Sequence, residues 1–483
     1  MNSKVPDQAG SDPAIAIIGG GFSGAMLCVQ LLRRREAADV QIVLIDRDPA
    51  LGRGVAYTTP FEGHLLNVRA NNMSAYPDLP DHFVNWARRN HSASVTPDDF
   101  LSRPLYGQYI VDQFENETKL HPGRVRRVRG EAVSLRRNGR VAEIYLSSGQ
   151  TVAANKVVLA TGHFPPANLP FRRKVQDSSR HFHNPWALSW PPDANKSGSV
   201  LLIGTGLTSV DVIIELRAQG FSGTIHILSR RGLLPQSHKS FAPISPFWTT
   251  DSPRTARGLL RQFRLHLKAT EESGADWRAV IDSLRPVTQE VWQRLPLVEQ
   301  RRFLRHLRTH WDVHRHRIAE PIGELLAEQL RTGKLQLHAG RVTEYCEDST
   351  SVHLAYRDRE SGETKTLRVD RIVNCTGPDS DLRKVGSPLL TSLFGTGLAR
   401  PDKVALGLDV ADDGAVVDAE GQPSSFLYTV GPLRKGKLWE SIAVPELRVQ
   451  IADLAKQLAT DLREDEKMRE APAETAASFL QFQ

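Results

Sequence analysis

The chain has 483 residues, enough for two or three domains, and its 40% hydrophobic and 24% charged residues are ordinary for a globular protein. The net charge of +7 fits anionic ligands such as phosphates as well as nucleic acid, but no nucleic-acid-binding motif accompanies it. Three cysteines without a C-x-x-C pair argue against a disulfide framework, a zinc knuckle and a redox dithiol. With no long apolar run and no signal-like leader, we expect a cytoplasmic protein without a membrane span.

The first motif follows an apolar run that begins at Ala14. The sequence Gly19-x-Gly21-x-x-Gly24 comes directly after this run, and a helical pattern follows it. We expect strand, tight turn and helix, in which a pyrophosphate approaches bare backbone at the helix N-terminus. The next apolar run ends in Asp46, which we expect on a ribose hydroxyl, although it could be a solvated carboxylate. The residues predicted to bind this dinucleotide are Gly19, Gly21, Phe22, Ser23, Gly24 and Asp46.

A glycine-broken loop follows Asp46. A loop at this place can cover the far end of the dinucleotide, so we take four of its polar residues as candidates to contact that end. They are Arg53, His64, Asn67 and Arg69. An ordinary charged surface loop is an equally good interpretation.

Short helices are predicted at 81–89 and 100–120. The apolar period then changes to two, which indicates a small antiparallel meander between residues 125 and 159. The run that closes it ends in Thr161-Gly162, where we expect backbone to pass close to the first dinucleotide.

A second copy of the opening motif begins at Gly204. Gly204-x-Gly206-Leu207-Thr208-Ser209 follows a strand pattern and opens a helix. The next strand ends in Ser229-Arg230-Arg231 instead of an acid. A hydroxyl and two guanidiniums suit the 2′-phosphate of NADPH, whereas solvated strand-end charges are the alternative.

The strand and helix alternation stops after Gly232. Helical patterns fill a predicted insertion at about 240–330, which lies within the second dinucleotide domain. His306, His310 and His314 are spaced to share one helix face among many arginines. We favour a basic face that contacts solvent or an anion over a metal site.

The end of the chain repeats earlier features. A strand pattern ends in Thr376-Gly377, which suggests that the chain re-enters its first domain. A later buried strand and the turn Gly431-Pro432 are expected beside the first dinucleotide, before a helix at about 444–462. We therefore predict a first domain from 1–195 and 370–465, a second domain at 196–369, and a loose tail at 466–483.

Several stretches resemble a bacterial FAD/NAD(P)-binding family of two-dinucleotide-binding flavoproteins. They are Gly54-Val-Ala-Tyr57, His64-Leu-Leu-Asn-Val-Arg-Ala70, Gly204–Thr208, Ser229–Pro235 and Trp439–Arg448. The resemblance implies an α/β fold of two nested Rossmann-like domains, with FAD at the first motif and NADPH at the second. This family is similar to N-hydroxylating flavin monooxygenases. The segment Ser179–Trp186 lacks the glycine of Baeyer–Villiger enzymes, and Gly431-Pro432 replaces the usual Gly-Asp.

The resemblance implies that NADPH reduces a bound flavin, which then reacts with O₂. We expect a monooxygenase acting on an amino group of a small polar or anionic substrate, such as an amine or amino acid. His64, Asn67 and Arg69 are the candidate catalytic residues at the flavin, and arginines of the insertion are candidates to hold an anionic substrate. A reductase or oxidase that passes electrons to a quinone, and a non-catalytic redox sensor or scaffold, remain alternatives. The oligomeric state stays open.

Overall fold

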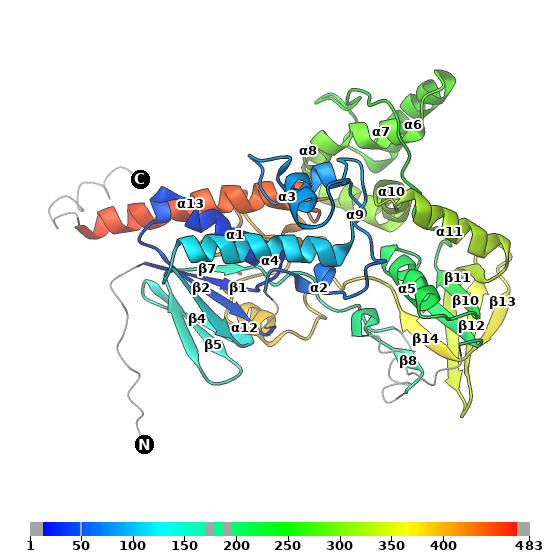
Figure 1. Cartoon of the computed structure of the whole chain (residues 1–483), viewed down its shortest axis with the longest axis horizontal. Coiled ribbons are helices and arrows are strands. Elements are labelled where there is room, and N and C mark those ends of the chain that lie inside the picture. Colours follow the sequence, from blue (N-terminus) through cyan, green and yellow to red (C-terminus); the bar gives the residue numbers. More distant parts are fainter. Residues whose placement is uncertain (1–12, 49–50, 170–177, 188–195, 471–483) are drawn as a thin grey trace.

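The computed structural model describes residues 13–48, 51–169, 178–187 and 196–470, with side chains up to residue 464. It shows two sheet-containing bodies side by side, with a group of helices above their junction (Figure 1). Residues 1–12, and residues 471–483 of the tail predicted at 466–483, lie outside the described residues. Within the described ranges, no helix combines the length and apolarity needed to cross a membrane.

The first body is built on a six-stranded sheet in the order β15-β16-β7-β1-β2-β3, in which only β15 runs antiparallel to its neighbour. Its strands are β1 (Ala14–Ile18), β2 (Gln41–Asp46), β3 (Val125–Arg129), β7 (Lys156–Leu159), β15 (Ala415–Val417) and β16 (Pro423–Thr429). The middle of the meander predicted at 125–159 forms a separate antiparallel sheet of β4 (Ala132–Asn138), β5 (Val141–Leu146) and β6 (Thr151–Ala154). Its two ends, β3 and β7, instead pair in parallel within the first sheet, which the pattern of period two did not indicate.

Both faces of this parallel sheet are covered. Alternate residues of β1 point to opposite faces, so Ile15 and Ile17 pack in one core and Ala16 and Ile18 in the other. The first core is closed by α1, α4 and α13, and the second by the meander and α12. The helices of this body are α1 (Phe22–Leu32), α2 (Gly54–Tyr57), α3 (His82–Asn90), α4 (Arg103–Leu120), α12 (Pro388–Gly395) and α13 (Val444–Glu470).

The second body has a seven-stranded sheet in the order β13-β12-β11-β10-β9-β14-β8. Its strands are β8 (His181–Phe182), β9 (Ser199–Ile203), β10 (Thr224–Ser229), β11 (Leu335–Glu347), β12 (Val352–Asp358), β13 (Thr364–Val369) and β14 (Arg371–Asn374). Helices α5 (Leu207–Ala218) and α11 (Glu320–Arg331) cover one face, while β12 and the far half of β11 pack on the other. This body contains the strand, turn and helix that the repeated motif predicts, at β9 and α5.

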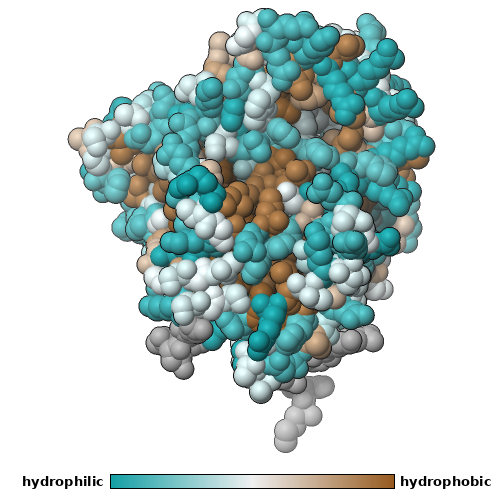
Figure 2. All heavy atoms as spheres, turned by 90° about the vertical axis from the view of Figure 1, so that its right-hand side faces the viewer, coloured by the Kyte–Doolittle hydropathy of each residue, from teal (hydrophilic) through white to brown (hydrophobic). Residues whose placement is uncertain are grey.

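Five helices separate β10 from α11. They are α6 (Ala256–Glu272), α7 (Trp277–Ser283), α8 (Thr288–Arg294), α9 (Leu297–His306) and α10 (Arg308–Arg315). The insertion therefore ends before α11, which packs in the core of the second sheet through Leu326. Seen from the side of the second body, hydrophobic side chains gather in a depression bordered by hydrophilic ones (Figure 2).

Two predicted boundaries differ from the structure. We expected the chain to return to the first domain at residue 370, but β14 pairs in parallel with β9 and β8 of the second sheet. The return comes after Asn374, because the strand before Thr376 completes the second sheet. Residues 466–470, which we assigned to a loose tail, are instead the last residues of α13.

Candidate functional site

The first glycine-rich turn joins β1 to α1 as predicted. Gly19 has a φ of +111°, and a Cβ there would overlap the carbonyl oxygen of Ala160. A Cβ on Gly24 would overlap the carbonyl oxygen of Gly19. Helix α1 begins at Phe22 without a side-chain cap, so the N–H groups of its first turn have no capping side chain and suit an anion.

Asp46 lies beside this turn at the end of β2. One of its carboxylate oxygens accepts the N–H of Gly20, and the other accepts the N–H of Asp48 at 2.7 Å. Because each carboxylate oxygen has a second lone pair, Asp46 can still accept a ribose hydroxyl. In the structure, therefore, it also holds the glycine-rich turn in place.

The loop after β2 lies over the same turn. The N–H of Gly52 donates to the carbonyl oxygen of Gly20 at 2.6 Å, and Gly54 faces Gly21 with no side chain between them. Arg53 donates to Gln108 of α4 at 3.1 Å. The predicted loop and the predicted turn are thus brought together.

Two further predicted segments flank the start of α1. The hydroxyl of Thr161 is buried and has no hydrogen-bond partner among the described residues. Gly162 and Gly431 have φ values of +69° and +88°, and a Cβ on Gly431 would lie 3.2 Å from Ser23 Oγ. Pro432 begins a short helical turn after it. An unpaired hydroxyl beside an uncapped helix start fits a bound nucleotide.

The second glycine-rich turn has the same build. A Cβ on Gly204, at a φ of +115°, would overlap the carbonyl oxygen of Cys375, just before Thr376 and Gly377. Ser209 replaces the third glycine and donates its hydroxyl to the carbonyl oxygen of Gly204 at 2.8 Å. A Cβ on Gly206 would meet nothing within 4 Å. Helix α5 starts at Leu207, followed by Thr208, and its start has no side-chain cap.

The residues after β10 have different surroundings. Ser229 accepts hydrogen bonds from Thr205 Oγ1 and the N–H of Gly232, both at 3.0 Å. Arg231 donates to the carbonyl oxygen of His306 and contacts His310 Nε2, both at 3.0 Å. It therefore links the end of β10 to helices α9 and α10 of the insertion. Arg230 is exposed, and no described residue forms a hydrogen bond or ion pair with it. Among Ser229, Arg230 and Arg231, the guanidinium of Arg230 is therefore the one left free to bind an anion.

His64 lies between the two bodies. It is 2% exposed, and its Nε2 donates to the carbonyl oxygen of Asp211 in α5 at 3.2 Å. Its Nδ1 accepts the hydroxyl of Thr59 at 2.8 Å. Burial lowers the pKa of His64, although the Asp211 carbonyl opposes this shift. A neutral ring protonated on Nε2 satisfies both contacts.

An ion pair crosses the same junction. Arg103, at the start of α4, lies 2.9 Å from a carboxylate oxygen of Asp211. Burial raises the pKa of Asp211 to about 6, against the opposing effect of Arg103. We did not predict either residue from the sequence. The signal was an acid between Val210 and Val212, on a helix whose residues from Ser209 to Ile213 are all buried.

The other two candidate catalytic residues also contact neighbouring segments. The carbonyl oxygen of Asn67 lies 3.1 Å from Nε2 of His238, which belongs to the segment after β10. Arg69 donates to the carbonyl oxygen of Asp98 at 2.9 Å and lies over the ring of Phe100. The structure thus places His64 and Asn67 at the junction of the two bodies and Arg69 against its own body.

Glu440 joins the last turn of the first body to the insertion. Its φ of +64° is rare for a residue with a side chain. Its carboxylate accepts Trp311 Nε1 at 3.0 Å and lies 3.2 Å from His316 Nε2 and 3.6 Å from Arg315. Burial opposes ionisation, but the charge and hydrogen bond of His316, with Arg315, hold the pKa of Glu440 well below its usual range. The turn and α10 are therefore clamped together.

The histidine series has a different arrangement from a metal site. His306 ends α9, and His314 Nδ1 donates to the carbonyl oxygen of His310 at 2.7 Å. Among the described residues, the group with metal-ligand spacing is instead Asp312, His316 and Glu440. These side chains already form hydrogen bonds or ion pairs with each other, Arg308 or Arg315.

Comparisons with known proteins agree with this geometry. Residues 16–164 match the model of a family described as FAD-NAD(P)-binding. An uncharacterized protein of Mycobacterium tuberculosis and one of Mycobacterium bovis are each 25% identical over 287 residues, covering 55% of this chain and 51% of the relative. The chain thus spans about half the length of the curated relatives it matches.

Solved structures are similar over most of the chain. The cadaverine monooxygenase of Erwinia amylovora, solved with FAD, has a TM-score of 0.64 at 13% identity and covers 92% of this chain and 94% of its own. L-lysine 6-monooxygenase of Pseudomonas syringae has a TM-score of 0.62 at 16% identity, and ornithine hydroxylase of Pseudomonas aeruginosa has a TM-score of 0.61 at 15% identity. Each of these two matches covers 93% of this chain and 99% of the other chain. At identities this low, the matches are evidence for the fold alone. They confirm the predicted fold class. The chain therefore carries an FAD-NAD(P)-binding domain at residues 16–164, within the fold of two-dinucleotide-binding flavoproteins.

Proposed function

We propose that this chain is an FAD-dependent, NADPH-using monooxygenase that oxygenates an amino group of a small polar or anionic substrate. The observation that carries the proposal is the pair of uncapped helix starts, at Phe22 and Leu207, each behind a turn in which glycine leaves the backbone bare. One such turn is common in nucleotide-binding proteins. Two in one chain suit a flavin and a nicotinamide that exchange a hydride.

The residues around the first turn support FAD as its ligand. The start of α1 would hold the pyrophosphate and Asp46 the ribose, while Thr161 offers a buried hydroxyl without a described partner. Gly431 leaves bare backbone beside Ser23 at the start of α1, and Gly162 follows Thr161 with a positive φ. When bound, FAD supplies hydride acceptance from NADPH and activation of O₂.

The residues around the second turn support NADPH over NADH. The open space at Gly206 admits a pyrophosphate against the first turn of α5. At the end of β10, the Ser229 hydroxyl and the free Arg230 guanidinium suit a 2′-phosphate, whereas a carboxylate there would repel it.

The amino-group part of the proposal is supported by the fold relatives, whose names give ornithine, lysine and cadaverine as their substrates. In this chain His64, Asn67 and Arg69 stay our candidates for the wall of the reaction site. The ring of His64 is held from both nitrogens, which fixes its orientation, and burial lowers its pKa, which favours the neutral ring. Its role would be positioning and exclusion of water from the junction.

The absorbance spectrum of the purified, FAD-loaded protein tests the cofactor part. We expect a flavin spectrum that NADPH bleaches without O₂, and faster than NADH does. After admission of air in the presence of an amine such as ornithine, lysine or aspartate, a hydroxylated product should appear in proportion to NADPH consumed. Stoichiometric hydrogen peroxide with every amine tried would refute the monooxygenase.

A reductase is the second candidate, because thioredoxin reductase of Lactococcus lactis shares the fold with a TM-score of 0.53 at 12% identity. The cysteines of this chain do not support dithiol chemistry. Cys28 and Cys375 are buried, which raises the pKa of each, to about 12 for Cys28. Steady turnover with a quinone in the absence of O₂ would favour this candidate over the monooxygenase.

A further inference from the structure

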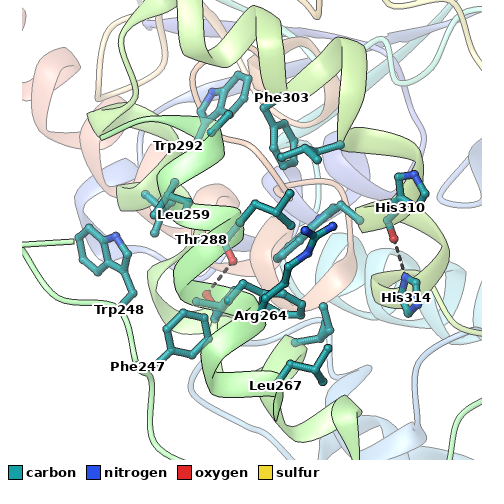
Figure 3. A pocket seen from close by; sticks show the side chains of 18 of the residues that line it. Phe247, Trp248, Leu259, Arg264, Leu267, Thr288, Trp292, Phe303, His310 and His314 are labelled. Atoms are coloured by element: carbon teal, nitrogen blue, oxygen red, sulfur yellow. Dashed lines mark hydrogen bonds between the residues drawn. The ribbon is translucent and has the colours of Figure 1, made fainter. Parts of the chain in front are cut away.

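The helical insertion contains an apolar cavity of about 440 Å³. This volume is in the range of pockets that hold small organic ligands. Figure 3 shows its side chains converging from several helices. The lining includes Leu259, Phe263 and Leu267 of α6, Trp277 of α7, Trp292 of α8 and Trp311 of α10. No glycine of either dinucleotide turn lines it, so it lies apart from the two candidate pyrophosphate sites.

Helix α6 supplies one whole wall. Leu259, Phe263 and Leu267 are spaced four residues apart and therefore share a face. Only Ala256 of this helix is fully buried. Leu259 packs against the Trp292 cluster and Phe263 contacts Phe247, so the apolar face is only partly covered and its remaining surface borders the cavity. Covering such a face is favourable by roughly 25 cal/mol per Å² of apolar surface. An apolar occupant would gain this energy.

Aromatic rings form another part of the lining. The rings of Trp292 and Trp439 are stacked with centroids 5.1 Å apart, and Phe303 meets Trp439 edge-on at 5.5 Å. Aromatic ligands gain from offset and edge-to-face contacts with such rings, beyond the area they bury. The lining thus favours a flat ring over a flexible acyl chain.

One lining cation lacks a partner. Arg264 is exposed, and no described residue forms a hydrogen bond or ion pair with it. Its side chain extends from α6 toward the cavity in Figure 3. The acid in the lining, Glu271, forms no ion pair with it. A guanidinium pairs best with a carboxylate, which it can bind through two parallel hydrogen bonds.

We propose that this cavity binds an aromatic carboxylate of one or two rings, with the rings against α6 and Trp292 and the carboxylate at Arg264. The site goes beyond the proposed function, because neither cofactor nor the oxygenation of an amine requires it. The cavity also reaches the first body, since Trp439 follows the Gly431 turn and Lys435 Nζ lies 5.3 Å from its ring. The occupant would therefore lie next to the segment that contributes to the predicted FAD site.

Isothermal titration of the full-length, FAD-loaded protein with 2-naphthoate tests the site without any turnover. We expect one site per chain. Leu267→Ser should weaken binding about tenfold, because it removes apolar lining. The matched control is Leu265→Ser on the same helix, since Leu265 is 62% exposed and outside the lining. Equal affinities of these two variants would overturn the proposal.

The role of the charge is tested separately by a substitution at Arg264, whose exposed side chain is not needed for folding. Arg264→Gln should weaken 2-naphthoate about fivefold and leave the uncharged 2-naphthamide unchanged. Arg261→Gln, an exposed arginine of α6 outside the lining, should change neither. Equal effects of Arg264→Gln on both ligands would refute the carboxylate, and tighter binding of decanoate than of 2-naphthoate would refute the aromatic ring.

Discussion

Gly206→Ala separates NADPH binding from folding at the second turn. Gly206 has a φ of −86°, which alanine adopts without strain, and the added methyl would meet no protein atom within 4 Å. Stability should therefore stay unchanged. The methyl does occupy the space in front of α5, so a pyrophosphate loses one charge-assisted hydrogen bond, worth about 1.5–3 kcal/mol. The dissociation constant for NADPH should rise about 10- to 150-fold.

The assay is anaerobic stopped-flow reduction of the bound flavin at increasing NADPH, together with thermal melting of the same samples. Gly395→Ala is the matched control, because Gly395 lies at the end of α12 with open space around it and far in sequence from both turns. Gly204→Ala is the opposite control and should lower the melting temperature, since its Cβ overlaps the backbone of Cys375. An unchanged NADPH dependence in Gly206→Ala would refute the proposed phosphate site.

Three further changes test neighbouring contacts. Arg230→Gln should weaken NADPH about tenfold and leave NADH unchanged, as measured by the same reduction kinetics; an equal loss for both nucleotides would contradict the 2′-phosphate contact. Asp46→Ala should weaken FAD about tenfold in equilibrium dialysis, because it removes the acceptor for Gly20 N–H and for a ribose hydroxyl, whereas Asp46→Asn should lose less. The pKa of Asp211 is raised to about 6, so its contribution to stability is present below its unfolded pKa of 3.8 and is lost as pH rises through about 6. Between pH 4 and 6.5 the wild type should lose roughly 2–3 kcal/mol relative to Asp211→Asn, and parallel melting curves would contradict this assignment.

The two dinucleotide turns could be predicted because local sequence determines them. Positive φ values at Gly19 and Gly204, and the backbone contacts behind each, require glycine in a fixed order between a strand and a helix. The meander at 132–154 was predictable for the same reason, since its period of two is visible within one stretch.

Contacts between distant segments could not be predicted in this way. No local pattern shows that Arg103 meets Asp211, or that His64 donates to α5, because these contacts depend on how the two bodies pack. The sheet membership of β14 was misplaced for a related reason. A buried strand ending in Thr-Gly has the same sequence pattern in either body, and only its pairing with β9 assigns it.

Helix α5 carries two kinds of contact about one turn apart. Its uncapped start at Leu207 faces the predicted nucleotide, and Asp211 contacts His64 and Arg103 of the first body. A helix of this length is a stiff rod of about 18 Å, so a change in its tilt alters both sets of contacts together. The coupling is reciprocal. If nucleotide binding strengthens or weakens the contacts at the junction, then a substitution at the junction must change the affinity for the nucleotide.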